Sequence, residues 1–174
     1  MTPVPVPPLV EVLLLGFPLP LFDRSREHMD GVMRELTFIA QARRSAGEHG
    51  VPERLLELVD ELVMRYAGLN SAPEAARDAA LERGDAEIDL AFRVPPDVGP
   101  DTRRFGDLLD EVDRYCAEGE HLLSLVTPPG PLRFRRWYLG EFLRQVDGGP
   151  PQRWEPRDWP WPVPLPDVPG EGSG

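Results

Sequence analysis

One histidine has neighbours that suit proton transfer near neutral pH. His28 lies in the segment SREHMD, directly after Glu27 and near the expected start of a helix. Histidine is the side chain that titrates near neutrality, and nearby charges tune its pKa. One hypothesis is therefore a small enzyme or ligand-binding domain that uses His28 with one of three neighbours: Glu27, Arg24 or Arg136. The simpler interpretation is that Glu27 and Asp30 are solvated and favour the positive end of the helix dipole.

A second histidine has the spacing of a metal ligand. Glu118 and His121 form an E-x-x-H pair, which is the spacing of carboxylate-bridged di-iron sites on helices. Gly119 interrupts the helix at this point, and the chain contains no second E-x-x-H pair. The chain also has none of the glycine-rich, nucleophile or zinc-binding motifs of common nucleotide-binding proteins and hydrolases. We therefore expect no metal and no cofactor.

The cysteine content and the N-terminus indicate the cellular compartment. Cys116 is the only cysteine and falls on the apolar stripe of an expected helix, where a thiol behaves as a small hydrophobic group rather than a nucleophile. A single cysteine excludes an intramolecular disulfide, which fits a reducing cytoplasm. The N-terminal apolar run is broken by Glu11 and follows no basic segment, so we expect neither a signal peptide nor a membrane span.

A basic and aromatic segment, LRFRRWYLGEFLRQ, occupies residues 132–145. Phe134, Tyr138 and Phe142 recur at the spacing of one helix face, which predicts a buried stripe. The outer face then carries three arginines that we expect to meet acidic protein surface, in this chain or in a partner: Arg133, Arg136 and Arg144. We expect no nucleic-acid binding, because a net charge of −11 repels phosphate and a few arginines on one helix do not offset that repulsion.

The chain ends in a proline-rich segment that contains Trp159 and Trp161 between prolines. Such a ribbon is pre-extended and suits docking in an aromatic groove of a partner, while packing on its own domain is the alternative. Both interpretations stay open. The composition predicts a proline-rich lead-in at 1–8, a single domain at 9–149 and a flexible tail at 150–174.

Periodicity predicts the elements that must position these groups. Alternating or continuous apolar residues predict strands at 9–15 and 88–94, and a third short strand or a buried loop at 121–130. Ser71 and Glu74 have the spacing of a capping box. Amphipathic spacing predicts helices at 21–46, 52–67, 72–83, 101–118 and 131–146. The expected class is α+β, mainly helical, with about five helices packed on one side of a two- or three-stranded sheet.

Four blocks, SREHMDGVMRELTFIA, RYAGLN, ERGDAEIDLAFRVPP and RFRRWYLGEFLRQV, resemble a group of actinobacterial proteins associated with partner-switching regulators. Those regulators are anti-sigma kinases, STAS-domain antagonists and PP2C-type phosphatases, and the resemblance spans most of residues 9–151. The kinases need an E-x-x-x-N box for the magnesium of ATP, but Tyr66 stands four positions before Asn70, the only asparagine. The resemblance thus implies a non-enzymatic cytoplasmic regulatory protein that binds another protein, with a homodimer as an option.

Overall fold

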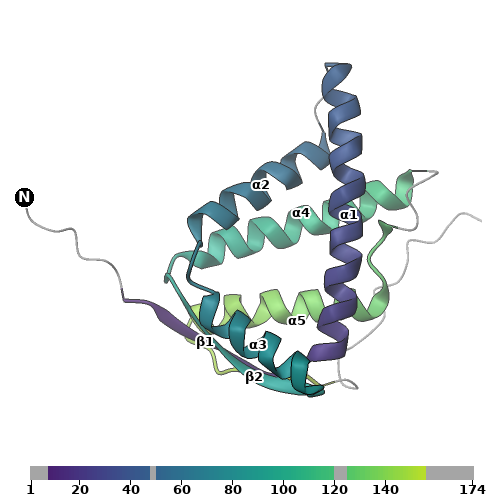
Figure 1. Cartoon of the computed structure of the whole chain (residues 1–174). Coiled ribbons are helices and arrows are strands. Elements are labelled where there is room, and N and C mark those ends of the chain that lie inside the picture. Colours follow the sequence, from purple (N-terminus) through teal and green to yellow (C-terminus); the bar gives the residue numbers. More distant parts are fainter. Residues whose placement is uncertain (1–7, 48–49, 120–124, 156–174) are drawn as a thin grey trace, which may run out of the picture.

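The computed structural model describes residues 8–47, 50–119 and 125–155. Within these ranges the chain forms five helices and a two-stranded antiparallel sheet, so the expected α+β class with mainly helical content is confirmed (Figure 1). Residues 125–128 form no strand, and the rest of the possible third strand falls largely outside the described ranges. The elements in chain order are β1 (Val10–Pro18), α1 (Leu19–Ser45), α2 (Val51–Arg65), α3 (Ser71–Arg83), β2 (Glu87–Val94), α4 (Val98–Glu118) and α5 (Pro129–Val146).

The two strands pair over nearly their whole length, with Leu14 opposite Leu90. β1 continues past its predicted end because Gly16 adopts a φ of 66°, which permits a bulge between Leu14 and Phe17. The backbone N–H of Gly16 donates to the Asp89 carboxylate at 2.6 Å, so the bulge is anchored to β2. The alternation predicted for β2 is confirmed, since every second side chain near its C-terminal end is buried.

The apolar interior is divided into two clusters. Figure 1 shows α2 and α4 lying together on one side, α3, α5 and the sheet on the other, and α1 running past both groups. We call the first cluster the sheet core; its buried members include Val12, Leu14, Phe17, Leu90, Phe92, Phe134, Trp137 and Phe142. We call the second the helix core, formed by α1, α2 and α4 through Val32, Leu36, Leu55, Leu58, Leu108, Leu109, Val112 and Cys116. Helix α5 contacts both α1 and α4 and so joins the two cores.

The folded chain continues beyond Gly149, where the sequence analysis ends the domain. The Trp154 side chain is only 9% exposed, and its ring lies 5.4 Å from that of Trp137 between centroids. The indole N–H of Trp137 donates to the Gln152 carbonyl at 3.1 Å, and the Trp154 N–H donates to the Leu15 carbonyl at 2.9 Å. Prolines prevent a helix here but leave extended chain free to pack. Residues 150–155 therefore pack as part of the domain.

The start of α3 differs from the prediction. Ser71 is the first helical residue, and Asn70 occupies the cap position without a side-chain cap. The Ser71 hydroxyl donates to the Gly68 carbonyl at 3.3 Å instead of accepting from the first turn. The predicted capping box of Ser71 and Glu74 is therefore wrong, because a residue already inside the helix cannot serve as its cap.

No helix in the described part of the chain is long and apolar enough to cross a membrane.

Candidate functional site

His28 lies on α1 and is half-buried, with one ring nitrogen left unsatisfied. The Leu125 carbonyl accepts a hydrogen bond from the imidazole. Nε2 is buried and has no hydrogen-bond partner among the described residues. Nε2 is therefore covered by surrounding protein atoms rather than open to solvent.

Burial is the main cause that lowers the pKa of His28 below its ordinary value of 6.5. The nearby Asp113 carboxylate opposes this shift, the Arg135 guanidinium adds to it, and the bond to the Leu125 carbonyl opposes it. The net direction is downward, so the imidazole is neutral near neutral pH.

A cluster of paired charges lies beside His28 and joins α4 to α5. Arg135 donates to Asp110 at 2.6 Å and to Asp113 at 2.7 Å, and its side chain is only 10% exposed. Thr127 donates to the Asp113 carboxylate through its N–H at 2.9 Å and through its hydroxyl at 2.7 Å. The guanidinium and the Asp113 carboxylate are therefore held by several bonds each, which fixes the surroundings of the imidazole.

Arg135 is the functional-site residue that the sequence analysis missed. The expected contact between the arginine-rich helix and the acidic face of α4 does form within the chain, but Arg135 makes it. Two features of the sequence favour this contact. Arg135 stands four residues before Leu139, beside the apolar stripe, and the facing helix carries acids three residues apart at 110 and 113.

The His28 side chain lines a pocket of about 280 Å³ between α1, α4 and α5, which we call the His28 pocket. Its walls are mostly apolar and come from both cores, with Phe105, Tyr138 and Leu139 at the junction. The same three residues also line a second pocket of about 210 Å³ on the other side. The two pockets lie where the sheet core and the helix core meet.

The three residues expected to assist His28 do not line its pocket. Arg24 and Glu27 are exposed on α1, and Arg136 is half-buried on α5. The pocket hydroxyls are already engaged in local bonds: Ser25 donates to the Leu21 carbonyl at 2.7 Å, and Thr127 donates to a carboxylate. Among the described pocket residues, the structure therefore pairs no nucleophile with the imidazole.

The arginines expected on an outer face of α5 are half-buried, because α5 lies centrally and residues 150–155 fold back over it. Arg133 lies over the Trp154 ring, 5.8 Å from its centroid. Arg144 pairs with the fully buried Glu141, and burial lowers the pKa of Arg144. Trp159 and Trp161 lie outside the described residues.

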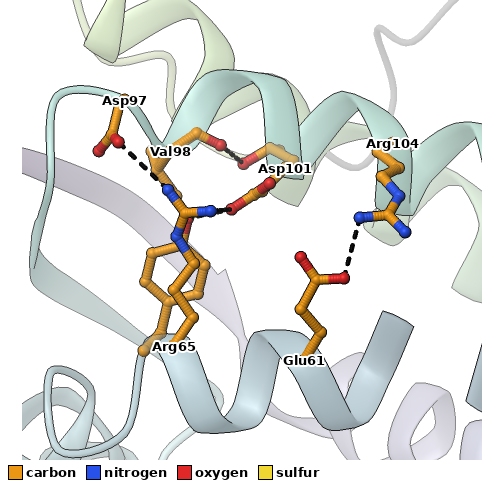
Figure 2. Close-up of polar contacts among 8 residues, drawn as sticks. Glu61, Arg65, Asp97, Val98, Asp101 and Arg104 are labelled. Carbon is orange, nitrogen blue, oxygen red and sulfur yellow. Dashed lines mark hydrogen bonds and ion pairs between the residues drawn. The ribbon is translucent and has the colours of Figure 1, made fainter. Parts of the chain in front are cut away.

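A network of charged and polar groups fastens the C-terminal end of α2 to the N-terminal end of α4 (Figure 2). Tyr66 donates to Asp101 at 2.5 Å, and Arg65 pairs with Asp101 at 3.3 Å and with Asp97 at 3.2 Å. Burial, with the bond to Asp101, raises the pKa of Tyr66 above its usual range. Arg104 on α4 reaches back to Glu61 at 3.0 Å. This network positions the second pocket, which Tyr66 and Asp101 line.

The remaining candidates are the Cys116 thiol and the Glu118–His121 pair. Cys116 is buried in the helix core, and burial raises the pKa of its thiol, with Asp113 adding to the shift. Within the described ranges no group of histidine, cysteine and acidic side chains is arranged to hold a metal ion. His121 lies outside those ranges, while Glu118 is exposed at the end of α4.

No family model, no curated protein and no solved structure matches this chain.

Proposed function

We propose that this chain is a non-enzymatic regulatory protein that acts by binding another protein, and that α1 carries the contact surface. The supporting observation is the exposure of Phe38, whose side chain is 67% accessible on the outer face of α1. Val32, Leu36 and Ala40 on the opposite face are buried, so Phe38 adds nothing to the helix core. Exposed aromatic side chains are typical anchors of protein interfaces.

The surroundings of Phe38 define the chemistry of the partner. Arg34 is exposed and lies one turn before Phe38 on the same face of α1. A hollow lined by Thr37, Gln41, Arg44 and Ser45 lies along another face of the same helix. An exposed aromatic ring with an arginine one turn away fits a partner surface with an apolar recess beside a carboxylate.

The sequence resemblance gives this interaction its context. The block SREHMDGVMRELTFIA corresponds to residues 25–40 and therefore contains Arg34 and Phe38. We propose that the partner belongs to a sigma-factor partner-switching system in the cytoplasm. A free, buried cysteine is compatible with that reducing compartment.

The test compares proteins captured from the native host by the full chain and by two variants. Phe38→Ser removes the proposed anchor, whereas Met64→Ser removes an equally apolar side chain on α2 that is 80% exposed. We expect a protein that the full chain and Met64→Ser retain and that Phe38→Ser loses. The purified partner should then bind the Phe38→Ser chain at least tenfold more weakly in calorimetry, about 1.4 kcal/mol.

Three results would contradict the proposal. Equal capture by both variants would remove Phe38 from the interface, and recovery of chaperones alone would remove the partner. A dimer in light scattering that Phe38→Ser converts to a monomer would identify a second copy of the chain as the occupant instead.

A further inference from the structure

The His28 pocket lies beside the first turns of α5 and has a mostly apolar wall. Its volume is about 280 Å³, and a cavity of about 150 Å³ is enough to hold benzene. An indole ring, about half as large again as benzene, therefore fits in it. The apolar wall includes Phe22, Met29, Phe105, Leu109, Phe134 and Leu139.

The chain beyond α5 runs back along this helix toward the pocket. The Gln152 N–H donates to the Glu141 carboxylate at 2.9 Å. Two residues later, the Trp154 ring lies 5.4 Å from that of Trp137 and 6.3 Å from that of Phe134, between centroids. The contacts thus move toward the N-terminal end of α5 as the chain proceeds. Phe134 itself lines the His28 pocket, so the last described residues lie one aromatic ring away from it.

The chain beyond Glu155 is long enough to reach the pocket. Trp159 and Trp161 belong to the segment RDWPWP, residues 157–162, which lies outside the described residues. A proline-rich chain advances by about 3.1 Å per residue, so the two tryptophans come at most about 15 and about 22 Å after Trp154. A helix with its side chains is about 10 to 12 Å across. Either tryptophan can therefore pass the start of α5 and reach the pocket.

The N-terminal residues 1–7 do not fit this role. They join β1 at the end where Val10 pairs with Val94, whereas Trp154 bonds Leu15 toward the other end of the strand. They also contain no aromatic side chain. The C-terminal segment is therefore the one whose position and side chains both suit the pocket.

The charges on the two sides also correspond. Two of the residues that line the pocket, Arg26 and Asp30, are exposed, and Arg26 approaches Asp23 at 3.8 Å. The segment carries Arg157 and Asp158 directly before its first tryptophan, so each side offers one charge of either sign. Exposed ion pairs add little energy, but they favour one direction of the chain across the pocket.

We propose that residues 157–162 dock on their own domain and place one indole, that of Trp159 or Trp161, in the His28 pocket. A pre-extended proline-rich backbone loses little entropy when it docks. Tethering also raises the effective concentration of the segment to about 1 mM, so a weak contact is enough to fill the pocket. The contact is separate from the Phe38 surface and does not rest on the proposed partner.

The first experiment measures competition for the pocket. A peptide of residues 156–166 is titrated against the full chain and against the full chain that carries Trp159→Ala and Trp161→Ala. We expect the double variant, whose pocket is open, to bind the peptide with a Kd of about 0.1 mM or below. The unmodified chain should bind it at least tenfold more weakly, because its own segment competes at about 1 mM. Leu165→Ala, just beyond the segment, is the matched control and should behave as the unmodified chain.

The second experiment reports on the pocket itself. Met29 lines the pocket, and its methyl resonance responds to the ring current of an added indole. We expect this resonance to move in the double variant and to move back when the peptide saturates it. The methyl of Met64, whose side chain is 80% exposed on α2, should stay in place in every sample. The single variants Trp159→Ala and Trp161→Ala then identify the indole, since only the loss of the docked one moves the Met29 methyl.

Four results would overturn the proposal. The first two are equal affinity of the peptide for the unmodified chain and the double variant, and the absence of saturable binding to the double variant at millimolar peptide. The third is a Met29 methyl at the same position in both chains. The fourth is a dimer in light scattering that the double variant converts to a monomer, which would place the segment on a second copy of the chain.

Discussion

The Glu141 carboxylate accepts a hydrogen bond from the backbone N–H of Gln152 at 2.9 Å, although the Glu141 side chain has no exposure to solvent. Gln145 donates to the same oxygen at 2.8 Å and also bonds both backbone groups of Leu13 on β1. Arg144 pairs with the other oxygen. One buried acid on α5 therefore holds residues 150–155 and, through Gln145, the first strand.

We predict that Glu141→Ala lowers the free energy of unfolding by about 3 kcal/mol, because it leaves the Gln152 N–H and the Arg144 guanidinium without their acceptor. Glu82→Ala, at an exposed position on α3, should change it by less than about 0.5 kcal/mol. Urea unfolding measures both values. Equal, small effects would show that the buried carboxylate has no structural role.

The length of the folded domain can be tested with two shortened chains. A chain that ends at Gly149 lacks Trp154 and the carbonyl that binds the Trp137 indole, and we expect it to be at least about 3 kcal/mol less stable than a chain that ends at Glu155. Trp154→Ala in the full chain should reproduce most of this loss. If the two shortened chains melt at the same temperature, the packing of residues 150–155 is not needed for stability.

Tyr138 should make the protein sensitive to alkali. Burial raises the pKa of Tyr138 to about 12 from the ordinary value of 10.0. The folded chain keeps this proton where the unfolded chain releases it, so the contribution is intact below about pH 10 and is lost as pH rises toward about 12. The loss is about 2 to 3 kcal/mol at about 1.4 kcal/mol per pKa unit.

Tyr138→Phe removes this proton and should flatten the fall in stability between about pH 10 and about pH 12, as measured by urea unfolding at several pH values. Tyr66, whose pKa is also raised, continues to contribute in this variant. A variant that loses stability as steeply as the unmodified protein would show that the Tyr138 phenol ionises as freely in the folded chain as in the unfolded one.

His28 should titrate below its ordinary pKa of 6.5, which NMR of its ring protons can follow. Asp113 from α4 and Arg135 from α5 face it, with Arg26 and Asp30 of α1 at the same pocket. Because the folded-state pKa is lowered, the histidine's contribution to stability is present above about pH 6.5 and is lost as pH falls. Asp113→Asn should lower the midpoint further, and a midpoint at or above 6.5 in the unmodified protein would contradict the assignment.

Local periodicity was sufficient to predict the five helices and the β2 strand, because each buries one regular face. It could not predict contacts between distant segments. Arg135 pairs with α4 only because α4 and α5 pack together, and Trp154 is buried only because the chain turns back after Gly149. Periodicity also gives no sign that Phe38 is a contact residue, because an aromatic side chain on the outer face of α1 leaves the spacing of the buried residues unchanged.

The pairing of Leu13 with Gln145 joins residues 132 positions apart, and the Trp154 N–H bonds the carbonyl of Leu15, two residues further along the same strand. During synthesis, β1 leaves the ribosome before the other described elements. Its partners Gln145 and Trp154 are made only after nearly all of the described chain. The helices of the helix core come from residues 19–118 and can associate earlier. The sheet core is therefore the last part to close, and until then its apolar strand is available to chaperones or to another nascent chain.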